Sequence, residues 1–168
     1  EQLKCEAGEF ESDTERTRNY NLLSFLHCKA DERDKAHEYN RKVLELQNEN
    51  IVALCNRIWM LRKDGRLTEA DKSLAAVEKL VECNQNLLFQ GKAEIAYSYS
   101  VFGPLYFSQS VDMYTQLLVE IGNKEIAAKD LQLWKLDLGI IYRKYCNCGN
   151  ILPKEDWKER NIDDFIKK

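Results

Sequence analysis

The octapeptide "KDGRLTEA" at residues 63–70 separates two apolar stretches with helical periodicity. Gly65 suits the end of the first helix, Thr68 is a candidate N-cap for the second, and Glu69 favours its first turn. When the chain is aligned with itself, this turn falls on "KADERDKA" at residues 29–36. A turn that recurs in this way predicts a protein built from helical hairpins.

The same alignment matches the two helices that flank the turn. It pairs residues of like character: Phe25 with Trp59, Leu26 with Met60, Lys29 with Lys63, Ala36 with Ala70, Val43 with Val77, Leu46 with Leu80, and Asn50 with Asn84. The alignment of the second repeat with a third needs a shift along the sequence that is six positions longer, and it pairs Trp59 with Tyr99 and Ala70 with Ser110. We place the six extra residues before the first helix of the third repeat, in or near "CNQNLLFQG" (83–91).

Ala36, Ala70 and Ser110 mark the position where the two helices of each repeat are expected to cross. A longer side chain there would push the helices apart at a cost of ~1–3 kcal/mol. Farther along, "LWKLDLGIIYRKY" (133–145) predicts a fourth first-helix, with Gly139 as its small residue between large neighbours.

These patterns divide the chain into segments. We predict an acidic lead-in at 1–16, whose Ser12, Asp13 or Thr14 caps the first helix, three repeats at 17–50, 51–84 and 91–124, and a region at 126–168 that holds a further helix or partial fourth repeat and a C-terminal capping helix. The predicted fold is an all-α superhelix of about three tetratricopeptide repeats, since a hairpin of ~34 residues with a small residue early in its second helix is the tetratricopeptide pattern. An unrelated bundle of amphipathic helices is the alternative.

Two longer stretches, "YNLLSFLHCKADERDKA" (20–36) and "ALCNRIWMLRKDGRLTEADKSLAAVEKLV" (53–81), resemble the amino-terminal repeats of the interferon-induced tetratricopeptide proteins. "KAEIAYSYSVFG" (92–103), "SVDMYTQLL" (110–118) and "KEIAAKDLQLWKLDLGIIY" (124–142) are similar to a tetratricopeptide protein related to that group. The resemblance spans roughly residues 18–145. It implies single-stranded 5′-triphosphate RNA binding in antiviral innate immunity.

The composition narrows the classes of function. The 168 residues include only 7 Gly and 2 Pro, the net charge is −3, and no apolar run is long enough to span a membrane. Near-balanced charge does not by itself indicate nucleic acid or membrane as a partner. Most of the six cysteines lie in apolar helical patterns, which indicates reduced thiols in a cytoplasmic protein. The chain begins at Glu1 rather than Met, and we interpret it as a fragment of a longer array.

Helical repeats of this kind stack so that their first helices line a concave groove. The predicted groove residues are Arg18, Asn21, Phe25 and Lys29 in the first repeat, Asn56, Trp59, Arg62 and Lys63 in the second, Lys92 and Tyr99 in the third, and Arg143 and Lys144 in the fourth. The set contains seven Lys or Arg and no acid, so an acidic chain would present a basic and aromatic groove. In the alternative interpretation the aromatic residues are core and the cations sit at helix ends, where they suit the dipole.

Two ligands fit such a groove: an acidic protein segment or peptide, and single-stranded RNA stacked on the same rings. A third interpretation makes the segment a structural or dimerising part of a larger array, and the oligomeric state is left open. No catalytic triad or phosphate-binding glycine loop occurs, so we predict no enzyme and no cofactor. Cys146 and Cys148 lack a second ligand pair at metal-site spacing, and we interpret them as free thiols rather than a metal site.

Overall fold

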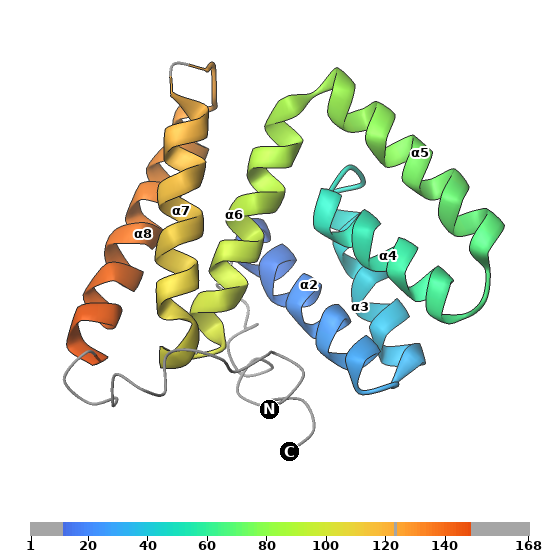
Figure 1. Cartoon of the computed structure of the whole chain (residues 1–168). Helices are drawn as coiled ribbons and strands as arrows, with labels where there is room; N and C mark the ends of the chain where they lie inside the picture. Colours follow the sequence, from blue (N-terminus) through green and yellow to red (C-terminus); the bar gives the residue numbers. More distant parts are fainter. Residues whose placement is uncertain (1–11, 123, 149–168) are drawn as a thin grey trace. The chain divides into compact units, whose positions relative to one another are not determined.

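The computed structural model describes residues 12–122 and 124–148, and every regular element in these ranges is helical. The elements, in chain order, are α2 (Asp13–Lys29), α3 (Arg33–Leu46), α4 (Ile51–Lys63), α5 (Leu67–Cys83), α6 (Gln85–Val101), a 3₁₀ turn η1 (Pro104–Tyr106), α7 (Phe107–Ile121) and α8 (Ala128–Cys148) (Figure 1). The predicted all-α class is therefore confirmed for these ranges. The chain divides into two compact parts, Glu1–Leu88 and Phe89–Lys168.

The first described helix starts inside the predicted acidic lead-in. Ser12 is its N-cap: the Ser12 hydroxyl accepts from the Glu15 N–H at 3.3 Å, and the Ser12 N–H donates to the Glu15 carboxylate at 3.0 Å. This reciprocal capping box satisfies two N–H groups at the start of α2. Of the three predicted caps, Ser12 is thus the one used. The remainder of the lead-in, residues 1–11, and the predicted capping helix after residue 148 lie outside the described residues.

Two successive helical hairpins, α2–α3 and α4–α5, close with the same turn. In the second, the Gly65 N–H donates to Arg62 O at 3.1 Å and the Arg66 N–H donates to Leu61 O at 2.9 Å. This is the Schellman arrangement, and it needs a left-handed residue just past the helix, here Gly65 at φ +75°. The prediction that Gly65 ends the helix is confirmed.

The predicted N-cap role of Thr68 is wrong. Helix α5 begins at Leu67, so its N-cap is Arg66, whose side chain makes no capping hydrogen bond. Thr68 lies within the first turn, because the Schellman turn already fixes where the chain re-enters a helix. Arg66 instead holds Glu69 in a two-point ion pair at 2.6 and 2.8 Å.

The predicted crossing residues are all fully buried. Ala36, Ala70 and Ser110 have no exposed surface. The Ser24 hydroxyl donates to Ala36 O at 3.0 Å and joins α2 to α3. The Ser110 hydroxyl donates to Ala96 O at 2.6 Å and joins α7 to α6. The third repeat tolerates serine at this position because its hydroxyl has a partner across the crossing.

The third repeat differs from the predicted register. The start of α7 at Phe107 aligns with the start of α5 at Leu67, as predicted. In the same alignment Lys63, the last residue of α4, pairs with Gly103, so α6 would end at Gly103. Helix α6 instead ends two positions earlier, at Val101. Two of the six extra residues therefore lie in the turn after α6, where Gly103 has φ +103° and η1 follows. The prediction that all six precede the third repeat is wrong.

Each compact part has its own apolar core. In the first part, Ile58, Leu61, Ala70 and Val77 join α4 to α5, while Cys28, Ala36 and Met60 form a second cluster. In the second part, residues of α6, α7 and α8 share one cluster that includes Tyr114, Leu117, Trp134 and Ile141. Among the described residues, no helix is long and apolar enough to cross a membrane.

Gly139, the small residue of the predicted fourth first-helix, does not lie on the packed face of α8. The residue is exposed on α8, and a Cβ added there would meet no side chain of the described residues within 4 Å apart from those of its two chain neighbours. The buried residues of α8 are Trp134 and Ile141 instead, and Leu138 packs beside them. The small residue of this predicted large–small–large pattern therefore lies outside the packed face of the helix.

Candidate functional site

Four of the predicted groove residues meet on α2 and α4. We call Phe25, Lys29, Trp59 and Lys63 the aromatic–lysine cluster. The Phe25 and Trp59 rings stack with centroids 5.5 Å apart and planes at 26°. Lys29 Nζ lies 5.8 Å from the Phe25 centroid and 5.3 Å from that of Trp59, and Lys63 Nζ lies 5.6 Å from Trp59. Both rings are half-buried, so part of this surface faces solvent.

The cluster arises because the second repeat stacks on the first in the register of the two aligned turns. Phe25 and Trp59 occupy equivalent positions of their helices, and so do Lys29 and Lys63. Each ammonium near a ring face gains about 0.5–1 kcal/mol of cation–π attraction at an exposed site. The result is a pair of cations held against a pair of rings.

Lys63 has a second, structural role. Its ammonium donates to Cys28 O at 2.8 Å, in the last turn of α2, where carbonyl groups have no partner within the helix. The same ammonium lies 3.5 Å from Asp31 Oδ1. Lys63 therefore connects the end of one hairpin's first helix to the next hairpin.

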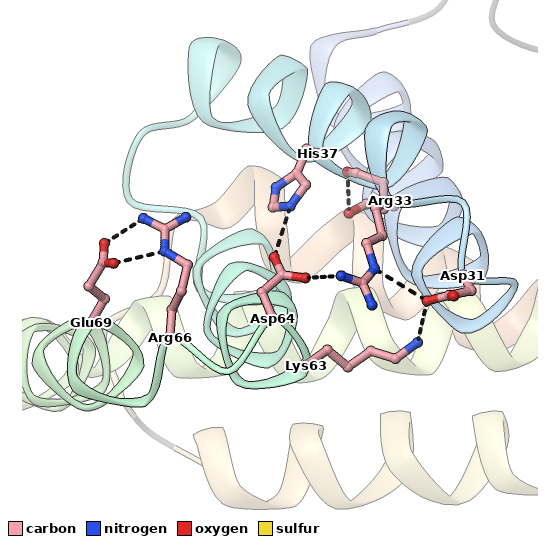
Figure 2. Close-up of polar contacts among 9 residues, drawn as sticks. Asp31, Arg33, His37, Lys63, Asp64, Arg66 and Glu69 are labelled. Carbon is pink, nitrogen blue, oxygen red and sulfur yellow. Dashed lines mark hydrogen bonds and ion pairs between the residues drawn. The ribbon is translucent and has the colours of Figure 1, made fainter.

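A network of charged side chains joins the turns of the first two hairpins (Figure 2). Arg33 donates to Asp64 Oδ1 at 2.9 Å and to Asp31 Oδ1 at 3.4 Å, and His37 Nε2 lies 3.6 Å from Asp64 Oδ2. A hydrogen bond from Arg33, helped by the charges of Arg33 and Lys63, holds the pKa of Asp31 below its usual value. A small pocket here is lined by Cys28, Arg33, His37, Met60, Lys63 and Asp64.

Two predicted groove residues are buried and do not face a ligand. Arg18 is 4% exposed and Asn21 is 2% exposed. The Asn21 amide donates to Asn50 Oδ1 at 3.0 Å, and that oxygen also accepts from the Ala53 N–H at the start of α4. Asn21 therefore stabilises an N-cap, and Asn56, which donates to Asn21 O at 3.3 Å, belongs to the same polar contact.

The predicted residues of the third repeat also lie elsewhere. Lys92 is paired with Glu120 of α7, so its ammonium already has a carboxylate. Tyr99 packs with Phe102 and Tyr106 around the turn after α6, at ring separations of 6.4 and 6.1 Å. Both side chains therefore stabilise the second compact part.

The corrected register explains this outcome. Counting back from the end of α6, the counterparts of Trp59 and Lys63 are Tyr97 and Val101, and Glu94 takes the place of Asn56. The third repeat therefore has an acid, Glu94, among positions that were predicted to contain none, and it has the apolar Val101 where the second repeat has Lys63. The aromatic–lysine cluster is a property of the first two repeats.

The remaining predicted residues are exposed cations. Arg62 makes a 3.4 Å ion pair with Asp71 across the turn, and both side chains are at least half exposed. Arg143 and Lys144 are exposed on α8 in the second part of the chain. The structure therefore brings together four of the twelve predicted groove residues as a cluster around two rings.

The turn network was missed because the sequence reasoning considered only the first helix of each repeat. A signal for it exists in the two aligned turns, "KADERDKA" and "KDGRLTEA", which are rich in both signs of charge. Turns at the same end of stacked hairpins lie close together, so Arg33 of one reaches Asp64 of the other. Opposite charges at equivalent turns are the pattern to seek.

We expect the free energy of unfolding to fall at acid pH because three turn carboxylates gain charged partners when the chain folds. Hydrogen bonds from Lys35 and His27 lower the pKa of Glu32, and a hydrogen bond from Arg66 lowers that of Glu69, as Arg33 does for Asp31. A lowered folded pKa contributes stability above the ordinary values of 4.5 and 3.8, and this stability is lost as pH falls through the folded values.

Urea unfolding between pH 7 and pH 3 measures this loss. Glu32→Gln should show a smaller drop than the wild type, whereas Glu78→Gln, an exposed change on α5, should show the wild-type drop. Equal pH profiles for all three proteins would contradict the assignment to Glu32. All three carboxylates are exposed, so added salt should also reduce the effect.

No group of three or more His, Cys, Asp or Glu that could hold a metal ion occurs among residues 12–122 and 124–148. The thiol of Cys28 is buried, and this burial raises its pKa.

No protein-family model matches the chain, and neither a curated protein nor a solved structure matches it.

Proposed function

We propose that the chain is a non-catalytic tetratricopeptide-type binding module that takes an acidic protein segment on the aromatic–lysine cluster. The observation that carries the proposal is the stacked Phe25–Trp59 pair with the ammonium groups of Lys29 and Lys63 beside it. The recurring helical hairpins with buried small residues at their crossings support the repeat assignment.

The chemistry of the cluster favours a ligand with carboxylates next to an apolar side chain. Carboxylates form charge-assisted hydrogen bonds with ammonium groups, and these are stronger than neutral hydrogen bonds. An apolar side chain covering the exposed part of the Trp59 ring removes both surfaces from water. Large aromatic residues at the centre of an interface commonly dominate its binding energy.

Single-stranded RNA is the second candidate, because rings beside lysines also form a platform for bases and phosphates. The two ligands differ in their response to salt. RNA binding should weaken with a slope near −0.7 per neutralised phosphate on a log–log plot. Binding of an acidic peptide anchored on Trp59 should depend less on salt and more on the ring.

We expect Trp59→Ala to weaken binding of a fluorescein-labelled peptide of alternating Asp and Leu residues by about tenfold or more, as for a central aromatic anchor. Trp59→Phe should retain most of the affinity because it keeps a ring stacked on Phe25. Lys29→Gln should weaken binding by about twofold to fivefold, since one exposed charge pair is worth less than about 1 kcal/mol. Fluorescence anisotropy measures all three variants.

Lys79→Gln is the matched control, because it removes a cation from an exposed position on α5. If it weakens binding as much as Lys29→Gln, the ligand responds to net charge and the cluster is not the site. Filter binding of 5′-triphosphate single-stranded RNA tests the second candidate in parallel. RNA retention with a steep salt slope, together with no peptide binding, would favour RNA and overturn the peptide proposal.

A further inference from the structure

Asp31 has a backbone conformation that glycine adopts more easily. It is the one non-glycine residue with positive φ among residues 12–122 and 124–148, at +59°. The Asp31 N–H donates to Cys28 O and the Glu32 N–H donates to His27 O, as in the Schellman turn that contains Gly65. Asp31 and Gly65 are therefore equivalent, and the second repeat uses the residue that this turn favours.

The Asp31 side chain lies beside the cations of the proposed site. Its Oδ1 atom is 3.5 Å from Lys63 Nζ and 3.4 Å from Arg33 Nε, and the side chain is 68% exposed. Figure 2 shows the carboxylate between these two groups, which come from different hairpins. Arg33 has a second and closer carboxylate partner in Asp64, at 2.9 Å. Lys63 also donates to the Cys28 carbonyl at 2.8 Å, but that oxygen carries no net charge, so the Lys63 ammonium has its ion pair with Asp31.

A left-handed aspartate costs more than a glycine, so its presence at this turn calls for a compensating role. Stability alone is a weak reason, because an exposed ion pair contributes little. The position of the carboxylate provides another reason. An acidic ligand that pairs with Lys63 must share the ammonium with Asp31 or displace it.

We infer that Asp31 is an internal competitor for the acidic ligand, and that it lowers the affinity of the aromatic–lysine cluster for carboxylates. This inference rests on the proposed function, since it concerns the same ligand. The charged groups that contact the carboxylate are Lys63 of the second hairpin and Arg33 of α3, and Asp64 in turn pairs with Arg33 and His37. Loss of the Asp31 charge leaves Arg33 held by Asp64 and Lys63 bonded to the uncharged Cys28 carbonyl, so the positive charge of Lys63 becomes available to the ligand.

The test compares three variants of the full chain with the wild type, using the labelled Asp–Leu peptide and fluorescence anisotropy at low salt. Asp31→Asn keeps a residue that tolerates positive φ and removes only the charge. Asp31→Gly removes the charge and the backbone cost together. Asp34→Asn is the control, because it removes the same charge from an exposed position in the first turn of α3.

Asp31→Asn and Asp31→Gly should both bind the peptide about threefold more tightly than the wild type, the effect of one exposed charge a few ångströms away in water. Asp34→Asn should bind as the wild type does. The gain should shrink at about 0.5 M salt, where the Debye length is only a few ångströms. An equal gain in Asp34→Asn, or no gain in either Asp31 variant, overturns the inference.

The two proposals fail in different ways. If the wild type binds the peptide through Trp59 but Asp31→Asn binds no better, the internal competitor is excluded and the binding module stands. If neither the wild type nor any variant binds, the proposed function is overturned and the inference falls with it. Binding by Asp31→Asn alone would support both, because it means that Asp31 blocks a working site.

Discussion

Replacing Tyr114 with alanine is expected to lower the free energy of unfolding by about 3–5 kcal/mol, as for other large-to-small changes of buried aromatic residues. Tyr114 has no exposed surface and lies in the core of the second compact part with Phe107, Leu117 and Trp134. The change removes a whole ring from a cluster that α6, α7 and α8 share. The cavity cannot collapse without moving a helix, so the full cost should appear.

Tyr114→Phe separates the ring from its hydroxyl. The hydroxyl donates to Asp137 Oδ2 at 3.0 Å, so this variant loses a hydrogen bond between α7 and α8 and keeps the packing. We expect a loss of about 1 kcal/mol, since Asp137 is partly exposed and water can replace the donor. Urea unfolding followed by far-UV circular dichroism measures both variants. Equal losses would contradict the central place of the ring in this core.

Ala70→Leu is expected to destabilise the chain by about 1–3 kcal/mol through overpacking. Ala70 has no exposed surface and contacts the core that Ile58 and Val77 form between α4 and α5. Three added heavy atoms at this crossing must separate the helices or force a side chain from its rotamer. Thermal and urea unfolding should show the loss, and the variant should remain helical.

Ala75→Leu is the matched control for this change, because Ala75 is exposed on the same helix. It should alter the free energy of unfolding by less than about 0.5 kcal/mol, as is usual for surface substitutions. A comparable loss in both variants would mean that leucine is poorly tolerated anywhere on α5. The close approach of α4 and α5 would then not explain why residue 70 is alanine.

Local features of the fold could be predicted because they depend on neighbouring residues. Gly65 ends a helix since glycine adopts positive φ, and Ser12 caps one since its hydroxyl meets a free N–H. The helix end and the cap each need only a few residues of context. Ala36 and Ala70 were predicted because the alignment of the chain with itself pairs them early in the second helix of each hairpin, and both are buried.

The third repeat was placed less well because only its second helix aligned clearly. The alignment of α7 with α5 is the same whether the extra residues precede α6 or follow it. The sequence "GPLY" (103–106) contains the explanation, since Gly103 and Pro104 lengthen the turn with a 3₁₀ segment. An alignment based on the second helix of a hairpin does not determine where the first helix of that hairpin ends.

Only some of the predicted groove residues meet, because helical periodicity predicts the direction in which a side chain points and not which residues surround it. Asn21 is placed on the predicted helix, yet its amide bonds to Asn50, 29 residues away. Lys92 is likewise neutralised by Glu120, 28 residues away. Such contacts depend on how the helices stack, which the spacing of residues along one helix does not contain.

The bond from Lys63 to Cys28 O has a consequence for how the chain unfolds. The second hairpin supplies an additional donor to a carbonyl in the last turn of α2, so the first hairpin gains this stability only once the second has folded. In an array whose stability is a sum of repeat and nearest-neighbour terms, this bond is a directional coupling. Val101, the counterpart of Lys63 in the third repeat, has no side-chain donor. The Lys63 bond therefore couples the first hairpin to the second.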